Sequence, residues 1–193
     1  FSELGVRKIR VTGGEPLIRR GAHELFEGLG ALAGLDSLAL TTNGSQLADS
    51  GHALRDAGVN SINISLDSLQ AERFKAITRI GDLNTVLRGI DRAVECGFDR
   101  IRLNAVILDG LNRDEVLPLT HYALEKGIHI AFIEEMPLGQ VNVGGKPLAY
   151  VSSDTLQKEL AEHFTLVPMT SSDTAGPARD FLIAGSQTQV GFI

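Results

Sequence analysis

The sequence predicts an α/β fold, a partial (βα) barrel of the TIM type with a short β extension at its C-terminal end. Short runs of β-branched residues alternate with longer amphipathic stretches, which is typical of βαβ units in a parallel sheet. Several such units follow one another, and this repetition favours a barrel over a sandwich. A glycine stands shortly before each expected strand and is suited to end the preceding helix: Gly5, Gly34, Gly58, Gly97 and Gly127.

The expected strands of the barrel are short and rich in β-branched residues: 8–12, 37–42, 61–66, 100–108 and 129–134. The expected helices carry apolar residues at helical spacing and lie between the strands: 21–33, 46–57, 70–77, 82–96 and 112–126. We assign residues 1–137 to the partial barrel.

The pattern changes in a C-terminal region, residues 138–193. A Gly-rich loop opens this region, and a helix over 152–164 follows, with Ser153 or Asp154 as its expected N-cap. Two further strands are expected to form a small hairpin against the barrel: 179–184 and 188–193.

Composition narrows the class of protein. With 43% hydrophobic and 22% charged residues among 193, the chain has enough apolar material for a sizeable core. The formal net charge of −6 disfavours a general nucleic-acid surface but leaves room for a local basic pocket. No apolar run is long enough to cross a membrane, and no signal peptide is visible. We therefore expect a cytoplasmic protein with neither a membrane nor a nucleic-acid partner.

Cys96 is the only cysteine, so no disulfide can form within the chain, and its place near a helix end suggests an inert, packed thiol. The five histidines show no metal-site spacing. The first residue is Phe1, in what reads as the tail of a helix, and the last is Ile193, within an apolar, strand-like run. Because native ends are usually polar, we expect a chain that is cut at both ends.

Polar motifs follow the expected strands at their C-terminal ends, where parallel barrels bind ligands. The motifs are Thr12-Gly13-Gly14-Glu15, Thr41-Thr42-Asn43-Gly44, Ser65-Leu66-Asp67-Ser68, Asn104 and Glu134-Glu135-Met136-Pro137. Each motif is a weak signal alone, but their recurrence on successive strands predicts one ligand-binding rim.

Two kinds of residue in these motifs suit a ligand. Gly13 and Gly14 would let the backbone approach a ligand closely, and Pro16 fixes the next turn; a plain strand-to-helix turn is the alternative. The hydroxyls of Thr41 and Ser65 stand at strand ends and suit a ribose or a phosphate. Satisfied turn hydroxyls are the alternative there.

Lys8 and Arg10 lie two residues apart on one strand, so their side chains share a face. If that face lines the barrel, the two cations need an anionic partner, and a triphosphate suits the planar fork of Arg and the point charge of Lys. An outward-facing basic edge is the alternative. For Arg102 two interpretations are open, a contact with a phosphate and a surface salt bridge. For Met136 the two interpretations are a contact with a cofactor and packing in the core.

Taken in order, five segments resemble those of the GTP 3′,8-cyclase family, also called molybdenum cofactor biosynthesis protein A, within the radical S-adenosylmethionine superfamily. The segments are Lys8-Ile9-Arg10-Val11-Thr12-Gly13-Gly14-Glu15-Pro16-Leu17, Leu40-Thr41-Thr42-Asn43-Gly44, Asn63-Ile64-Ser65-Leu66-Asp67-Ser68, Leu103-Asn104-Ala105-Val106 and Phe132-Ile133-Glu134-Glu135-Met136-Pro137. The resemblance covers residues 4–193. Its GGEP motif marks the superfamily, whereas TTNG, SLDS and FIEEMP together mark the family.

The resemblance implies a lyase reaction in which a 5′-deoxyadenosyl radical from S-adenosylmethionine starts the conversion of GTP to (8S)-3′,8-cyclo-7,8-dihydroguanosine 5′-triphosphate. It implies that five residues bind S-adenosylmethionine: Gly13, Gly14, Glu15, Ser65 and Met136. It implies that four residues bind GTP: Lys8, Arg10, Thr41 and Arg102. Arg102 stands where many relatives have Lys, and Ala131 where some have Arg, so the phosphate contacts are expected to differ in detail.

Members of the family hold two iron–sulfur clusters through cysteines. The Cys-x3-Cys-x2-Cys motif of the [4Fe–4S] cluster that reduces S-adenosylmethionine would lie before Phe1, and three more cysteines would lie beyond Ile193. No metal ligand is therefore assigned in this chain, and we expect the isolated chain to bind no cluster and to lack cyclase activity. Two other interpretations stay open, a truncated nucleotide-binding remnant and another radical S-adenosylmethionine enzyme.

The resemblance also implies partners. GTP is the expected substrate, and an electron donor is required that the sequence does not identify. Cyclic pyranopterin monophosphate synthase is expected to act next in the pathway. A homodimer is a candidate assembly.

Overall fold

The computed structural model describes residues 4–135, 142–143, 146–147, 150–169 and 178–193. The chain divides into two compact units. The first unit is formed by Phe1–Leu66 and Thr78–Arg102, and the second by Asp67–Ile77 and Leu103–Ile193.

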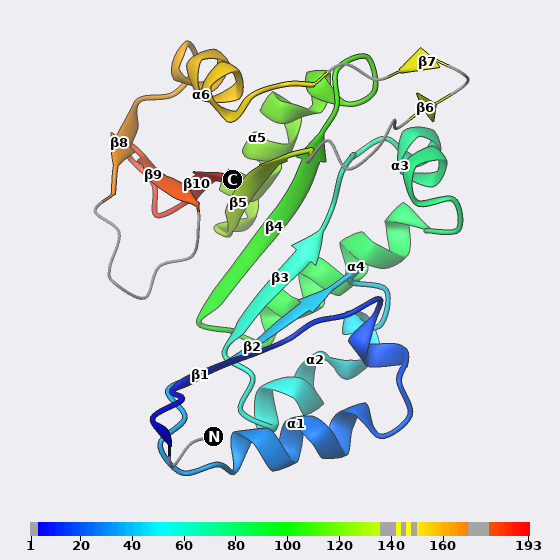
Figure 1. The fold of residues 1–193 in the computed structure, drawn as a ribbon, viewed down its shortest axis with the longest axis vertical. Coiled ribbons are helices and arrows are strands. Elements are labelled where there is room, and N and C mark those ends of the chain that lie inside the picture. The colour runs from blue at the N-terminus through cyan, green and yellow to red at the C-terminus, as the bar shows by residue number, and fades with distance from the viewer. Residues whose placement is uncertain (1–3, 136–141, 144–145, 148–149, 170–177) are drawn as a thin grey trace. The chain divides into compact units, whose positions relative to one another are not determined.

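Three parallel strands form the sheet of the first unit in this order: β1 (Lys8–Val11), β2 (Ser37–Thr42) and β3 (Ser61–Ser65). Three helices follow the strands along the chain: α1 (Ala22–Gly30), α2 (Leu47–Asp56) and α4 (Leu83–Glu95). A short 3-10 turn, η2 (Pro16–Ile18), leads from β1 toward α1. Figure 1 shows the three helices on one side of these strands, as right-handed crossovers between neighbouring parallel strands require.

Side chains alternate between the two faces of this sheet. The face under the helices carries apolar residues that are almost fully buried: Leu38, Leu40, Ile62 and Ile64. The opposite face, which we call the polar face, carries residues that are exposed or half-buried: Lys8, Arg10, Thr41, Asn63 and Ser65. Parallel sheets usually have apolar layers on both faces. A parallel sheet with one polar face is therefore suited to line a ligand site.

Close contacts through glycine pack the helical layer. A Cβ atom added to Gly89 in α4 would collide with the carbonyl oxygen of Gly44, in the turn after β2. A Cβ added to Gly30 at the end of α1 would collide with the carbonyl oxygen of Ala57 at the end of α2. These glycines are required by packing within the chain itself.

Four strands form the main sheet of the second unit in this order: β5 (His129–Glu134), β10 (Gln189–Phe192), β9 (Arg179–Ile183) and β8 (Leu166–Pro168). β10 is parallel to β5, whereas β9 is antiparallel to both of its neighbours, β10 and β8. The rings of Phe132 and Phe192 lie in neighbouring strands with centroids 6.3 Å apart, and both side chains are buried. The C-terminal hairpin therefore shares a core with β5.

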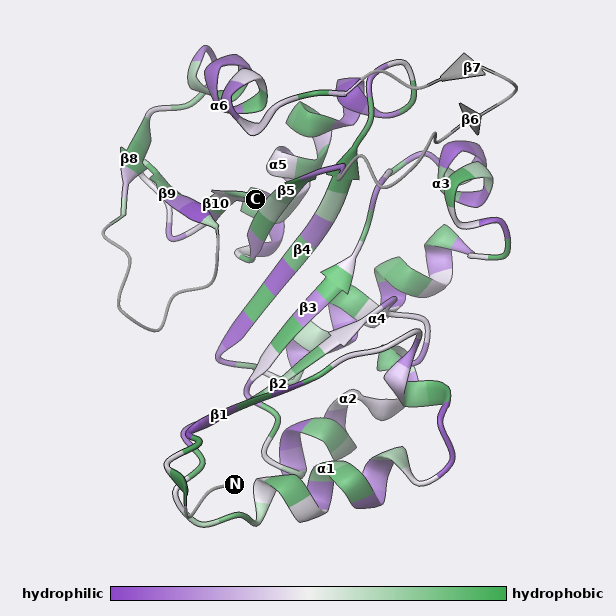
Figure 2. Cartoon of the chain, in the orientation of Figure 1, coloured by the Kyte–Doolittle hydropathy of each residue, from purple (hydrophilic) through white to green (hydrophobic). Residues whose placement is uncertain are grey.

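The remaining elements complete the second unit. Its helices are α3 (Ala71–Thr78), α5 (Val116–Lys126) and α6 (Ser153–Ala161), and a 3-10 turn, η3 (Arg113–Glu115), precedes α5. The strand β4 (Arg100–Ile107) runs from the first unit into the second, and Figure 2 shows its hydrophilic and hydrophobic residues alternating. Two short strands pair with each other: β6 (Asn142–Val143) and β7 (Lys146–Pro147).

The predicted α/β class is confirmed, and each expected barrel strand ends within one residue of its predicted bounds. The expected C-terminal hairpin is confirmed as β9 and β10. The predicted N-cap of α6 was wrong, because Ser152 occupies that position and its hydroxyl accepts a hydrogen bond from the Thr155 amide. The strand β8 was not predicted, since three residues ending in proline carry no alternation.

Two further expectations concern the limits of the fold. The expected boundary between the partial barrel and the C-terminal region, at residue 137, lies outside the described residues and stays a prediction. Among the residues that the structure describes, no helix has both the length and the apolar character needed to cross a membrane.

Candidate functional site

Two predicted site residues are in contact on the polar face. In the parallel register Arg10 lies beside Ala39, so it leaves β1 on the same face as Thr41 leaves β2. The Nη1 atom of Arg10 donates a hydrogen bond to the hydroxyl of Thr41 over 3.4 Å. Lys8 is also exposed on this face, as its spacing from Arg10 predicted.

Arg102 on β4 supplies a second guanidinium close enough to influence Arg10. The pKa of Arg10 is lowered, chiefly because burial disfavours its charged form and secondly because of repulsion from Arg102. Arg102 is only 8% exposed. An anion bound beside the two side chains would relieve both the repulsion and the loss of hydration.

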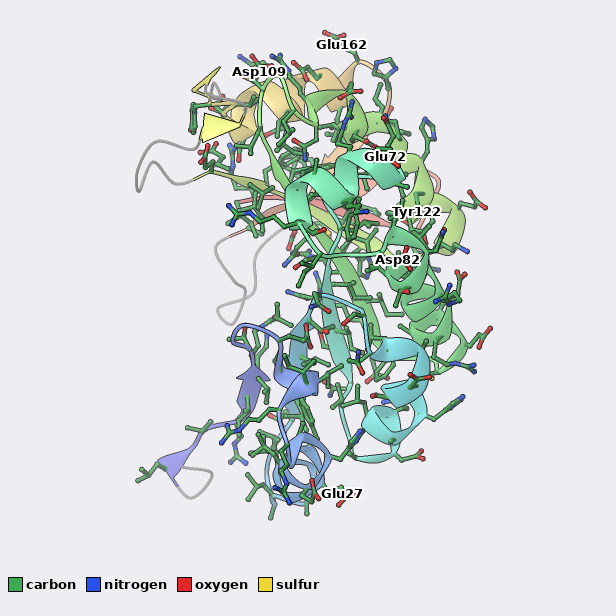
Figure 3. All side chains as sticks on the ribbon, turned by 90° about the vertical axis from the view of Figure 1, so that its right-hand side faces the viewer. Glu27, Glu72, Asp82, Asp109, Tyr122 and Glu162 are labelled. Atoms are coloured by element: carbon green, nitrogen blue, oxygen red, sulfur yellow. The ribbon has the colours of Figure 1, made fainter. Side chains whose placement is uncertain are left out.

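Each of the three helices of the first unit carries acidic residues. Glu27 on α1 is exposed, and Figure 3 shows it at the outer surface of the helix. Asp99, which is also exposed, pairs with Arg55 of α2 at 2.9 Å. A net charge of −6 is therefore compatible with a local cationic face on the sheet.

The carboxylate of Glu15 joins the turn after β1 to the turn after β2. Its Oε1 atom accepts hydrogen bonds from the Thr42 hydroxyl at 2.8 Å and from the Leu17 amide at 3.1 Å. Its Oε2 atom accepts one from the Asn43 amide at 2.6 Å. The two predicted motifs GGEP and TTNG are thus held together by one half-buried side chain, which we call the Glu15 clamp.

Gly13 and Gly14 lie just before this clamp, and both are exposed. A Cβ atom added to either residue would meet no heavy atom within 4 Å. Gly14 also has no positive φ angle, so neither packing within the chain nor backbone conformation requires a glycine there. A ligand that approaches the backbone closely would account for a glycine at this position.

The SLDS motif separates into two parts. Ser65 ends β3 and is exposed on the polar face. Asp67 instead accepts a hydrogen bond from the Val106 amide at 2.8 Å, and burial raises the pKa of its carboxyl, partly opposed by that hydrogen bond. Ser68 is fully buried and donates a hydrogen bond to Glu115. Ser65 is therefore the residue of this motif that is open to a ligand, whereas Asp67 and Ser68 bind protein groups.

Glu134 of the FIEEMP motif also binds protein groups. Its carboxylate accepts hydrogen bonds from the Tyr150 hydroxyl at 2.6 Å and from the Ser153 amide. The hydrogen bond from Tyr150 is the main reason that the pKa of Glu134 is lowered, and the hydrogen bond from Ser153 is the second. The hydrogen bond to Glu134 in turn raises the pKa of Tyr150. The contacts tie the end of β5 to the start of α6. Met136 lies outside the described residues.

Cys96 lies at the C-cap of α4, where its Sγ atom is 3.5 Å from Nδ1 of His52. Burial is the main reason that the pKa of this thiol is raised, so the thiolate form is disfavoured. Across residues 4–135, 150–169 and 178–193, no group of three His, Cys, Asp or Glu side chains could hold a metal ion. These features do not fit a [4Fe–4S] cluster, which is held by several cysteine thiolates.

Nothing in the sequence distinguishes two buried polar residues of the second unit from ordinary turn residues. Asn112 and Glu115 are each 1% exposed, and both bind the segment that follows β3. The only available signal is a polar run before an apolar helix, which is also the pattern of a plain helix start.

Comparisons with known proteins identify a matching superfamily and a set of curated relatives. The Radical SAM superfamily matches residues 1–123. GTP 3′,8-cyclase of Saccharophagus degradans is 49% identical over 193 residues, which is 100% of this chain and 58% of that protein. GTP 3′,8-cyclase of Ectopseudomonas mendocina is 52% identical over the same share of each chain. The chain thus spans 58% of the length of these curated relatives.

Solved structures with low identity support the fold alone. SuiB of Streptococcus suis has a TM-score of 0.62 at 16% identity, covering 81% of this chain and 36% of that one. A structure of TYW1 with a lysine-pyruvate adduct bound has a TM-score of 0.58 at 17% identity, covering 88% of this chain and 54% of that one. Both agree with a partial α/β barrel.

Proposed function

This chain belongs to the radical S-adenosylmethionine superfamily, and we propose that it forms the GTP- and S-adenosylmethionine-binding part of a GTP 3′,8-cyclase, a lyase of molybdenum cofactor synthesis in the cytoplasm. The observation that carries the proposal is the cationic polar face of the first unit, where Arg10 contacts Thr41 and is repelled by the charge of Arg102. The identity of about half of all residues with named cyclases supports the same substrate.

GTP would bind through its phosphates on the polar face. The guanidinium groups of Arg10 and Arg102 offer planar forks for phosphate oxygens, and Lys8 offers a point charge on the same face as Arg10. The Thr41 hydroxyl, which already accepts a hydrogen bond from Arg10, can donate its own proton to a phosphate or ribose oxygen. A bound triphosphate would thereby compensate charges that repel one another in the free chain.

S-adenosylmethionine would bind at the turn after β1 and at the end of β3. The proposed residues are Gly13, Gly14, Glu15, Ser65 and Met136. Open space beside both glycines leaves room for the ligand, and the exposed hydroxyl of Ser65 can bind a polar group. Because the carboxylate of Glu15 already accepts three hydrogen bonds, this residue would use its backbone toward the ligand. When bound, S-adenosylmethionine supplies the 5′-deoxyadenosyl group for radical chemistry.

The residues of this chain do not fit the iron–sulfur cluster that the superfamily implies, because Cys96 is its only cysteine. We therefore assign this chain the binding and orientation of GTP and S-adenosylmethionine, and no electron-transfer step. The isolated 193-residue chain is expected to be inactive as a cyclase.

A graft tests the proposal. The graft is the Saccharophagus degradans GTP 3′,8-cyclase in which the residues aligned with this chain are replaced by this chain. Reconstituted anaerobically, it should convert GTP to the 3′,8-cyclised product and release 5′-deoxyadenosine. Arg10→Ala in the graft should weaken GTP binding by at least about tenfold, since a hydrogen bond to a charged group contributes roughly 1.5–3 kcal/mol.

Arg55→Ala is the matched control, because Arg55 pairs with Asp99 on the helical side of the same unit. It should leave GTP binding unchanged. A graft that binds both ligands but forms no cyclised product would point to a remnant or to another reaction of the superfamily, and would overturn the proposal.

A further inference from the structure

A buried carboxylate in the second unit holds the segment that follows β3. Glu115 is 1% exposed, and its Oε1 atom accepts a hydrogen bond from the Ser68 hydroxyl at 2.5 Å. Its Oε2 atom accepts one from the Leu69 amide at 3.1 Å. Arg73, in the first turn of α3, adds a charged contact to Oε1 at 3.0 Å. We call this group the Glu115 clamp.

The charge of Glu115 is compensated within the clamp. Arg73 has a side chain that is 23% exposed, and it also binds Asp114 through both terminal nitrogens, at 2.7 and 3.1 Å. Such two-pronged contacts fix the direction of a guanidinium as well as its position. Both oxygens of Glu115 are therefore satisfied, which is the condition under which a buried polar network specifies one conformation.

A second buried residue, Asn112, binds the same segment two residues nearer to β3. The Nδ2 atom of Asn112 donates hydrogen bonds to the backbone oxygens of Asp67 at 2.9 Å and Val106 at 2.8 Å. Its Oδ1 atom accepts one from the Leu108 amide at 2.9 Å. The backbone after β3 is thus fixed at Asp67 by Asn112 and at Leu69 by the Glu115 clamp.

From this geometry we infer that Glu115 is a positioning residue for S-adenosylmethionine, which acts by fixing the chain immediately after Ser65. The inference rests on the proposed function, because it takes Ser65 as a contact of that ligand. Ser65 is only two residues before Asp67, so its backbone direction depends on how the following segment is held. If the segment adopts its bound geometry only part of the time, the apparent affinity for the ligand falls by that fraction.

A purely structural clamp would affect stability alone, so the test compares two ligands. Glu115→Gln in the graft replaces one acceptor oxygen by an NH₂ group, which then faces another donor. We expect the Kd of S-adenosylmethionine, measured by anaerobic equilibrium dialysis, to rise about tenfold or more, corresponding to a segment ordered about a tenth of the time. The Kd of GTP should stay within about twofold, because none of its proposed residues directly precedes or follows this segment in the chain, as Ser65 does.

Two variants complete the experiment. Ser68→Ala removes the hydroxyl that donates to Glu115 and accepts from the Gln70 amide, and leaves the other contacts of Glu115 in place. It should raise the same Kd by a smaller factor, and it decides the question if Glu115→Gln does not fold. Glu159→Gln removes a partly exposed carboxylate that pairs with Arg113, in the same 3-10 turn as Glu115 but outside the Glu115 clamp, and should change neither Kd. Hydrogen exchange of the Leu69 amide in the 193-residue chain should speed up in Glu115→Gln and not in Glu159→Gln.

The outcomes are separable. If Glu115→Gln and Ser68→Ala lower the unfolding midpoint but leave the Kd of S-adenosylmethionine unchanged, the inference is overturned and the proposed function stands. An equal loss of affinity for GTP and S-adenosylmethionine would also overturn it, since the effect would then be general. If the unsubstituted graft binds no S-adenosylmethionine, the proposed function itself fails.

Discussion

The Glu15 clamp of the first unit and the Glu115 clamp of the second use the same chemistry at different depths. In each clamp a carboxylate accepts hydrogen bonds from a hydroxyl and from at least one backbone amide in a segment that follows a strand, two amides for Glu15 and one for Glu115. Glu15 is half-buried, whereas Glu115 is 1% exposed and is paired with Arg73. The difference follows from solvation, because a buried carboxylate needs a compensating cation and a partly hydrated one does not.

Removal of the buried carboxylate should have the largest effect on stability. Glu115→Ala leaves Ser68 and the Leu69 amide without their acceptor in the interior, and Arg73 loses one of its two carboxylate partners. We expect the free energy of unfolding to fall by about 3 kcal/mol. Urea denaturation followed by circular dichroism would measure it. A loss below about 1 kcal/mol would show that burial does not distinguish the two clamps.

Removal of the half-buried carboxylate should cost less. Glu15→Ala leaves three donors, but water can replace the acceptor at this depth, so we expect a loss of about 1–2 kcal/mol in the same experiment. The ranking matters more than either value. Equal losses in Glu15→Ala and Glu115→Ala would contradict the comparison.

The hydroxyl of Thr42 separates hydrogen bonding from packing within the Glu15 clamp. Thr42 is 2% exposed, donates to Glu15 and accepts from the Gly44 amide at 3.1 Å. Thr42→Val keeps the shape and removes both bonds, so it should cost about 1 kcal/mol, whereas Thr42→Ser should restore most of that loss. If the serine variant were as unstable as the valine variant, the methyl group rather than the hydroxyl would be responsible.

The smallest effect concerns pH. Burial raises the pKa of Asp67 above its unfolded value, so the ionised form opposes folding. This destabilisation is complete when the pH is above the folded pKa, and it is absent when the pH is below the unfolded pKa. Asp67→Asn keeps an acceptor for the Val106 amide and should raise stability at pH 7 by up to about 1 kcal/mol. The gain should vanish as the pH falls to about 3, because Asp67 is then protonated in both states. A gain that does not depend on pH would contradict this explanation.

The comparison also shows what the sequence could reveal. Glu15 stands in a motif beside two glycines and a proline, and its place near a ligand turn was predicted from that pattern. The five barrel strands were predicted within one residue because β-branched runs and glycines mark each βα unit. The shared face of Lys8 and Arg10 followed from the two-residue period of a strand.

What the sequence could not reveal depends on contacts between distant residues. Glu115 and Ser68 are 47 positions apart, and nothing local to either residue indicates the other. For the same reason, Asp67 and Ser68 were expected on the ligand rim, since a polar motif looks the same whether it faces a ligand or a buried partner. The pairing of β10 with β5 likewise depends on a register that only the folded chain defines.

The central claim is that the polar face of the first unit binds a triphosphate, and calorimetric titration of the 193-residue chain tests it most directly. GTP should bind at least about tenfold more tightly than guanosine, because only GTP brings phosphates to the cationic face that carries Arg10 and Arg102. Arg10→Ala should remove most of this difference, and Arg55→Ala should retain it. Equal affinity for GTP and guanosine, or an Arg10→Ala variant that binds GTP as tightly as the original chain, would contradict the account.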